Sequence, residues 1–221
     1  MLKKMFLNIG GVSVVLALIM LFAALSNILL GRTLPEEGFG EFALMRTLVL
    51  FIAPLAVWGQ DVAAARFFAK HEATQYKWQR ALFNILGVGS ILALTGVAIA
   101  AIVYKIAWPK LLALLIASIA YIGTLFLSNF IRGQGRYRQA ILMLNGFRGF
   151  FFIFVLALYL TKSMTTTLTI LSYFAIIILF ALANTRYVFA TVPQGEQRVP
   201  RDMYTTGLLL MGGQASVTLI A

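Results

Sequence analysis

The 221-residue sequence contains no cysteine, a single histidine and only seven acidic residues. Without cysteine the chain forms no disulfide and offers no thiolate ligand for zinc or an iron–sulfur cluster. The lone His71 cannot supply a multi-histidine metal site, and so few acids leave little material for acid–base catalysis. The sequence therefore predicts neither a catalytic residue nor a bound metal or cofactor.

Apolar side chains are what the sequence has in excess. They make up 61% of the residues against 11% charged ones, and the mean hydropathy is +0.92. Soluble domains average roughly 45–50% apolar and about 25% charged. A single core in a chain of this size cannot hide so much apolar surface from water. The composition excludes a cytosolic enzyme, a disordered tail and a fibrous rod, and it indicates a chain that lies in lipid.

Long apolar runs divide the chain into six full segments and the start of a seventh. A helix needs about 20 apolar residues to cross the hydrocarbon core of a bilayer, and lipid requires that backbone groups be satisfied within the segment. The expected spans are residues 11–30, 42–58, 81–103, 111–130, 140–160 and 167–189, followed by 203–221. We therefore expect an all-α integral membrane protein, a six-helix transmembrane bundle with a truncated seventh helix.

The net charge of +11 would suggest nucleic-acid binding in a soluble protein. Here the basic residues gather instead in alternate connections between the expected spans. Twelve fall on one side, namely Lys3, Lys4, Arg66, Lys70, Lys77, Arg80, Arg132, Arg136, Arg138, Arg186, Arg198 and Arg201. Four fall on the other side, namely Arg32, Lys105, Lys110 and Lys162. By the positive-inside rule this pattern predicts a cytoplasmic N-terminus and argues against a nucleic-acid partner.

One connection, residues 191–202, is rich in proline, glycine and charge. We interpret it as a cytoplasmic linker. It would separate an N-terminal membrane bundle, residues 1–190, from the start of a second and incomplete bundle, residues 203–221.

Two arginines lie inside the expected spans. Arg148 is eight residues into its span, roughly 12 Å along the axis, where a cation costs about 2.5–3.5 kcal/mol on insertion scales. Asn145 precedes it by three residues and is expected to share its face. No acid lies inside these spans, so Arg148 indicates either a water-filled lumen for an anionic ligand or a bond to helix-end carbonyls. Arg46 lies about one turn from the outer end of its span, where it either lines the outer lumen or extends to the interface.

Polar residues between the spans give weaker signals. Residues 59–80 mix charged and aromatic side chains, which predicts a helix extension and a turn at the cytoplasmic interface. Within it, Asp61 is expected to pair with Arg66 or to contact a neighbouring helix. Gly87 and Gly89 predict close helix packing. The first outer loop is expected to hold Glu36, Glu37 and Glu41.

Two stretches resemble a known family. GRTLPEEGFGEFALM (31–45) resembles the turn after the first helix of bacterial polysaccharide exporters, with a Gly-Arg-x-Leu start and a Phe-Gly-x-Phe motif. WGQDVAAARFFAKH (58–71) resembles the same family's segment at the cytoplasmic end of the second helix. The matching positions are Phe39, Gly40 and Phe42 in the first stretch and Gly59, Arg66, Phe67 and Ala69 in the second. The pattern is similar to that of O-antigen flippases, which share a superfamily with lipid II flippases and MATE multidrug exporters.

The resemblance implies a fold of two six-helix bundles packed as a V around a cavity, of which this chain would be the N-terminal half. It implies alternating access and export of undecaprenyl-pyrophosphate-linked oligosaccharide across the bacterial cytoplasmic (inner) membrane for surface polysaccharide biosynthesis. The implied partners are this lipid-linked oligosaccharide, membrane lipids and the polysaccharide polymerase machinery. Arg148, Arg46 and Asn145 are the expected lumen residues that contact the substrate.

Other functions stay open. A cation-coupled multidrug exporter of the same superfamily would need a membrane carboxylate, and the expected spans have none. A non-transporting scaffold of an envelope-assembly complex would need no lumen, so a sealed or lipid-facing Arg148 would favour it. A membrane glycosyltransferase or polymerase is disfavoured because no acidic pair or metal-ligand cluster is visible.

Overall fold

The computed structural model describes the backbone of residues 2–220 and the side chains of residues 11–210. Helices make up 86% of the chain, and the described residues contain no β-strand. Six helical segments within the described part are long and apolar enough to cross a membrane. The chain is therefore an all-α, multi-pass membrane protein, as its composition predicts.

All six expected spans are helical, apart from Trp58 at the end of the second and Gly146 within the fifth. They correspond to α1 (Leu2–Thr33), α2 (Glu36–Val57), α4 (Trp78–Tyr104), α5 (Trp108–Gly133), the α6–α7 pair (Tyr137–Asn145 and Phe147–Leu160) and α8 (Thr166–Thr191). The other elements are α3 (Gln60–Lys70), the 3-10 turn η1 (Ala73–Gln75) and α9 (Arg201–Ile220). The helix α9 occupies the expected seventh segment, but from residue 211 onward its side chains lie outside the described residues.

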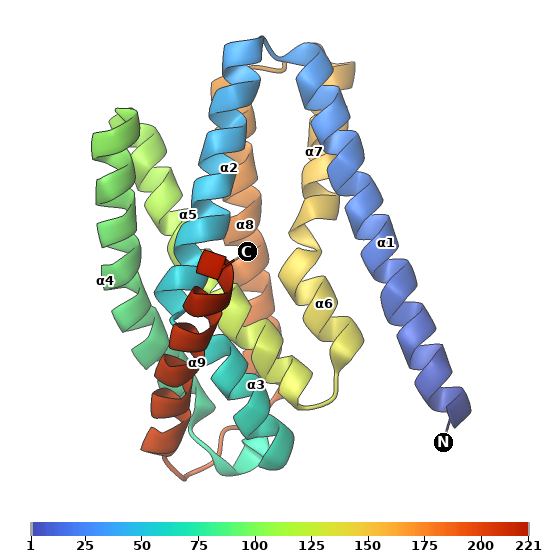
Figure 1. Cartoon of the computed structure of the whole chain (residues 1–221). Coiled ribbons are helices and arrows are strands. Elements are labelled where there is room, and N and C mark those ends of the chain that lie inside the picture. Colours follow the sequence, from blue (N-terminus) through green and yellow to red (C-terminus); the bar gives the residue numbers. More distant parts are fainter. Residues whose placement is uncertain (1, 221) are drawn as a thin grey trace.

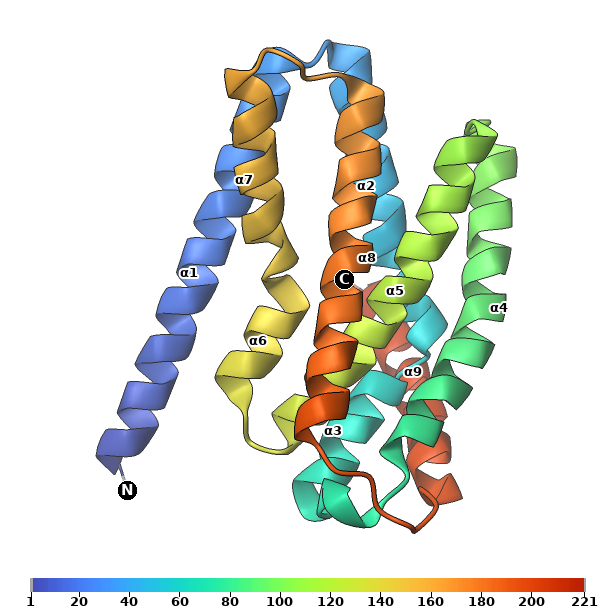
Figure 2. The same cartoon turned by 180° about the vertical axis from the view of Figure 1, so that it is seen from behind.

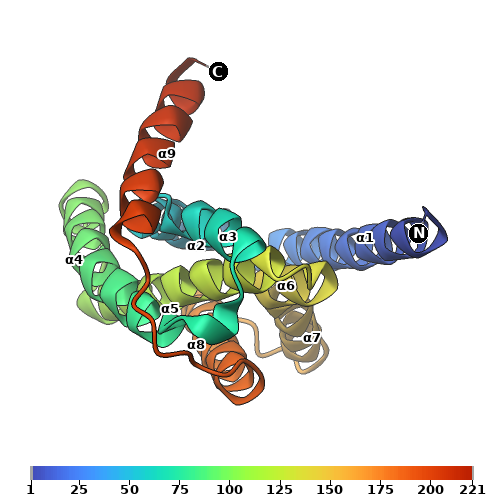
Figure 3. The same cartoon turned by 90° about the horizontal axis from the view of Figure 1, so that it is seen from below.

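The helix α5 lies at the centre of the bundle. It packs against α2, α3, α4, α6 and α8, and 61% of the residues in its apolar window are buried, compared with 11% for α1. The helix α1 packs along α6 and α7, meets α2 beside the turn that joins them, and diverges from α2 away from that turn (Figure 1, and from behind in Figure 2). Seen along the bundle, α1 and α9 extend outward in different directions (Figure 3). Much of the apolar surface of α1 is therefore left to face lipid.

The helix α2 begins six residues before its expected start. A two-residue connection that ends at Pro35 separates it from α1, and Glu36 and Glu37 occupy its first turn. Acidic side chains are favourable at a helix N-terminus because they face the positive end of the helix dipole. The expected acidic outer loop is therefore wrong: these residues and Glu41 lie in α2, where Glu41 forms an ion pair with Lys110.

The helix and turn expected after the second span are confirmed as α3 and η1. Trp58 and Gly59 both take the left-handed conformation, with φ of 45° and 74°, and this ends α2 and redirects the chain. The fully buried Gln60 then donates a hydrogen bond of 2.9 Å to the Tyr204 carbonyl of α9. This contact helps to hold α9 against α3.

Gly87 and Gly89, which were both expected to mark close helix packing, differ in what surrounds them. A Cβ atom at Gly89 would lie 3.2 Å from the Ala56 carbonyl oxygen and 3.3 Å from Ile122, so α2 and α5 do approach α4 closely there. A Cβ atom at Gly87 would meet nothing within 4 Å. The expectation is confirmed for Gly89 and wrong for Gly87, which lies on the exposed face of the helix.

Candidate functional site

The two arginines singled out from the sequence line one small pocket. Its lining residues come from four helices, with Ala23, Ser26 and Asn27 from α1, Arg46 from α2, Arg148 and Phe151 from α7, and Tyr173 from α8. The two arginines are 102 positions apart in the chain, so packing of α7 against α1 and α8 is what brings them to a common site.

Arg46 lies near the middle of α2. The sequence places it about one turn from the outer end of an apolar run, but α2 begins at Glu36, about 15 Å before Arg46 along the axis. The helix therefore extends further beyond Arg46 than the apolar run does, and Glu36, Glu37 and Glu41 occupy that extension.

Arg46 is bound to the neighbouring helix. Its Nη1 atom donates a hydrogen bond of 2.7 Å to Asn27 Oδ1. The amide is neutral, so it supplies an acceptor without cancelling the positive charge of the guanidinium. Both side chains are only partly buried. The Tyr173 hydroxyl is a second hydrogen-bond partner of Arg46 and is also uncharged. Arg46 therefore keeps part of its five donors and all of its charge for a further ligand.

Arg148 has even less protein around its charge. Its Nη1 atom lies 3.9 Å from the Met20 sulfur, a weak acceptor, and its Cζ atom lies 5.8 Å from the centroid of the adjacent Phe147 ring. Among the described residues, no carboxylate or carbonyl oxygen accepts a hydrogen bond from it. Of the two interpretations given by the sequence, a bond to helix-end carbonyls is therefore not what the structure shows.

Asn145 does not join this pocket. The expected face shared with Arg148 assumes one continuous helix, but the helix is interrupted at Gly146, between α6 and α7. Asn145 Nδ2 instead reaches the Ile141 carbonyl within α6, at 3.5 Å. A Cβ atom at Gly146 would lie 2.7 Å from the Phe180 ring of α8, so a larger residue here would displace that ring.

The pocket is cationic and narrow. None of its lining residues is acidic, and its free volume is about 10 Å³, close to what one water molecule needs. A larger anion would have to lie at the mouth, against the part-exposed guanidinium groups of Arg46 and Arg148. A planar guanidinium can bind two oxygens of a phosphate or carboxylate at once. Such an arrangement suits an anionic ligand and offers nothing to a cation.

Aromatic packing holds α7 against α2 and α8 beside the pocket. The Phe151 ring lies 5.6 Å from Phe42 and 4.9 Å from Tyr173, and Phe42 lies 5.6 Å from Tyr173. All three side chains are buried. Because such stacked and edge-to-face contacts restrict the rings, they fix the position of the helix that carries Arg148.

A separate polar contact lies near the C-terminal end of α5. Asp61 of α3 accepts a hydrogen bond of 3.1 Å from Asn129 Nδ2. Burial raises the pKa of the Asp61 carboxyl, and the positive charge of Arg132 opposes that shift only in part. Of the two partners expected for Asp61, the neighbouring helix is therefore correct, and Arg66 is exposed.

Sequence reasoning missed the residues that complete the arginine pocket. Asn27, Tyr173 and Ser26 carry no motif that would indicate a site. Comparison with known proteins adds no further assignment. No family model matches the chain, and no curated protein and no solved structure matches it significantly.

Proposed function

We propose that this chain is part of a transporter that carries a lipid-linked oligosaccharide across the bacterial cytoplasmic membrane. The proposed substrate is an oligosaccharide attached to undecaprenyl pyrophosphate, exported for surface polysaccharide biosynthesis. In this proposal the chain contributes the N-terminal bundle of a MATE-like fold, and the headgroup passes the arginine pocket while the access alternates.

One observation carries the proposal: two guanidinium groups from different helices share a pocket in the membrane with no acidic residue in its lining. A buried cation that served only structure would be expected to bond carboxylate or carbonyl oxygens. Arg46 bonds a neutral amide and the Tyr173 hydroxyl, and Arg148 contacts a thioether. A pyrophosphate would supply the oxygens that both groups lack, and the lipid tail would stay between helices in the bilayer.

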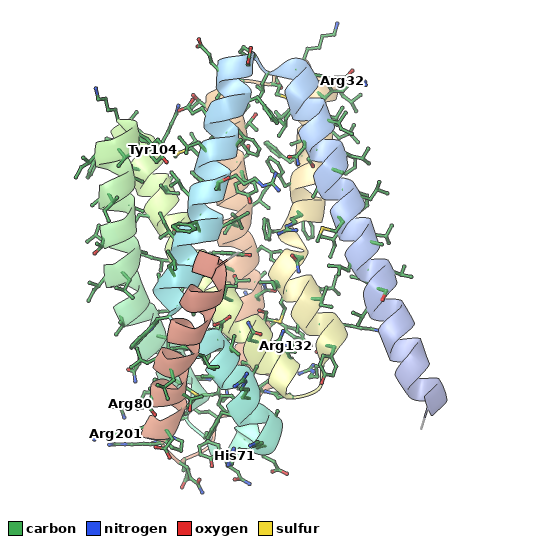
Figure 4. The ribbon with its side chains drawn as sticks, viewed as in Figure 1. Arg32, His71, Arg80, Tyr104, Arg132 and Arg201 are labelled. Atoms are coloured by element: carbon green, nitrogen blue, oxygen red, sulfur yellow. The ribbon has the colours of Figure 1, made fainter. Side chains whose placement is uncertain are left out.

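The distribution of charge supports the proposed orientation. Arg80, Arg132, Arg201 and His71 lie toward one end of the bundle, while Arg32 and Tyr104 lie toward the opposite end (Figure 4). The first end receives the connections that carry most of the basic residues, together with the start of α1 (Figure 1). By the positive-inside rule we assign that end, and with it the N-terminus, to the cytoplasm.

The absence of an acid at the pocket bears on the competing drug-exporter hypothesis. A cation-coupled exporter would use a carboxylate both to bind its coupling ion and to attract a cationic drug. The acids of α2 lie in its first two turns, and Glu41 is already paired with Lys110. The lining of the pocket therefore favours an anionic substrate.

The test is replacement of Arg148 by alanine in cells that depend on this protein for a surface glycan. We expect loss of the surface glycan, with the lipid-linked precursor accumulating on the cytoplasmic side. Replacement of the exposed Arg32, which lies outside the pocket, is the matched control and should leave export intact. Normal surface glycan from an inserted Arg148→Ala protein would remove Arg148 from the site.

A further inference from the structure

A second cationic pocket lies at the N-terminal end of α4. It is lined by Lys77, Arg80, Ala81 and Asn84 at the start of α4, by Arg198 and Val199 of the 191–202 segment, and by Tyr204 of α9. Its free volume is about 230 Å³, against the roughly 10–15 Å³ that one water molecule needs. It can therefore take a polar group of substantial size.

Backbone pairing builds this pocket from segments that are distant in sequence. The Lys77 amide donates to the Gln197 carbonyl at 2.8 Å, and the Gln197 amide donates to the Gln75 carbonyl at 3.0 Å. The Trp78 indole adds a bond of 3.2 Å to the Pro193 carbonyl. The 191–202 segment therefore returns to the start of α4, and Arg198 is held beside Lys77.

Three cationic side chains meet in the pocket without a counter-charge. Lys77, Arg80 and Arg198 make no side-chain hydrogen bond or ion pair with any residue in the described part of the chain, and no lining residue is acidic. Like charges that line one pocket repel one another unless an anion lies between them. Asn84 and Tyr204 add uncharged polar groups to the same wall. The lining is that of a site for a phosphate group.

The pocket opens onto a face of α4 that suits an acyl chain. Arg80, Asn84, Gly87 and Ile91 recur at intervals of three or four residues, so they share one face of the helix. That face is exposed, and Ile91 retains 67% of its accessible surface. A Cβ atom at Gly87 would meet no atom within 4 Å, so the helix surface is open at that point. Charged groups at one end of the stripe and apolar surface along the rest match the two parts of a phospholipid.

We propose that this pocket binds the headgroup phosphate of an anionic phospholipid, with its acyl chains along the exposed face of α4. A bound headgroup would neutralise Arg80 of α4 and Arg198 of the 191–202 segment together. It would thereby fasten that segment, and the α9 helix that follows it, to the membrane bundle. The inference does not depend on the proposed transport function, since it uses none of the residues of the arginine pocket.

The test measures binding of phosphatidylglycerol to the purified full chain in detergent by native mass spectrometry, with thermal unfolding as a second readout. Phosphatidylcholine and inorganic phosphate are the comparison ligands. We expect phosphatidylglycerol to bind and to raise the unfolding temperature, with neither comparison ligand doing so at equal concentration. Equal binding of phosphatidylcholine, or an equal effect of inorganic phosphate, would overturn the proposal.

Paired substitutions locate the site. Basic groups near an anionic headgroup contribute about fivefold each to binding, so Arg80→Gln with Arg198→Gln should weaken phosphatidylglycerol binding roughly 25-fold. The matched control is Arg186→Gln, since Arg186 is also exposed but does not line the pocket. Neither variant should unfold at a lower temperature than the wild type when no lipid is added, which shows that they fold. Unchanged lipid binding in the paired variant, or equal weakening in the control, would contradict the assignment.

Discussion

Replacing Arg46 by methionine is expected to stabilise the inserted protein while ending transport. The side chain lies about 15 Å into α2, where a cation costs about 2.5–3.5 kcal/mol on insertion scales. The hydrogen bond to Asn27 offsets part of this cost, because bonds between membrane helices contribute about 0.6 kcal/mol on average and up to about 1.7 kcal/mol. The difference favours the uncharged side chain by about 1–3 kcal/mol, and methionine can fill the same space.

Reversible unfolding in mixed micelles measures this difference. Trp78 is a suitable fluorescent reporter because it is fully buried and stacks on Phe130 with ring centroids 4.9 Å apart. Arg32→Met serves as the control, since Arg32 is exposed at the end of α1 and should change stability by no more than about 0.5 kcal/mol. Surface glycan from cells that carry each variant gives the functional readout.

If Arg46 is kept for its ligand at a cost in stability, the Arg46→Met protein should be more stable than wild type and should lose transport. Destabilisation of Arg46→Met by more than about 1 kcal/mol would show that the arginine serves the packing of α1 against α2. Transport at the wild-type rate in this variant would show that no ligand uses it. Either result would refute the role assigned to Arg46.

Two further predictions concern packing and pH. Gly133→Ala should destabilise the protein by about 1–3 kcal/mol, because the new Cβ atom would lie 2.7 Å from the Ala65 carbonyl oxygen. The control Gly87→Ala places its Cβ atom in open space and should be neutral or stabilising by up to about 1 kcal/mol. Equal melting temperatures of the two variants would contradict this. Because burial raises the pKa of Asp61, the folded state holds that proton to a higher pH than the unfolded state does. The contribution of Asp61 to the free energy of unfolding should therefore fall as the pH rises from its ordinary pKa of 3.8 through the raised folded value. Asp61→Asn keeps an acceptor for Asn129, so this variant should be more stable than wild type above this pH range but not below it. A difference in chemical-denaturation midpoints that does not change with pH would refute the assignment.

The spans and the fold class could be predicted from the sequence because lipid imposes a minimum length of apolar helix. The apolar run, however, marks the lipid-facing stretch and not the helix itself. Glu36 and Glu37 are polar enough to end the run but begin α2, so Arg46 lies further from the start of its helix than from the start of its apolar run. A helix start could have been inferred from Pro35 followed by two acids, which is a recognised N-terminal pattern.

The members of both pockets could be predicted only in part. Arg46 and Arg148 draw attention because a charge in an apolar run is costly, whereas Asn27 and Tyr173 are ordinary membrane residues until packing brings them to the same place. Asn145 was placed beside Arg148 by a helical spacing that the interruption at Gly146 breaks. The sequence indicates only a role in membrane orientation for Lys77, Arg80 and Arg198. They come together because the 191–202 segment returns to the start of α4, which the sequence does not reveal.

The central claim, that the arginine pocket recognises a pyrophosphate, is tested most directly by comparing two ligands that differ in that group alone. The full chain in lipid nanodiscs would be titrated with undecaprenyl pyrophosphate and with undecaprenol, which has the same tail and no charge. The account predicts at least tenfold tighter binding of the pyrophosphate, and loss of that preference in Arg46→Gln with Arg148→Gln. Equal affinity for the two lipids in the wild-type protein, or an unchanged preference in the paired variant, would contradict it.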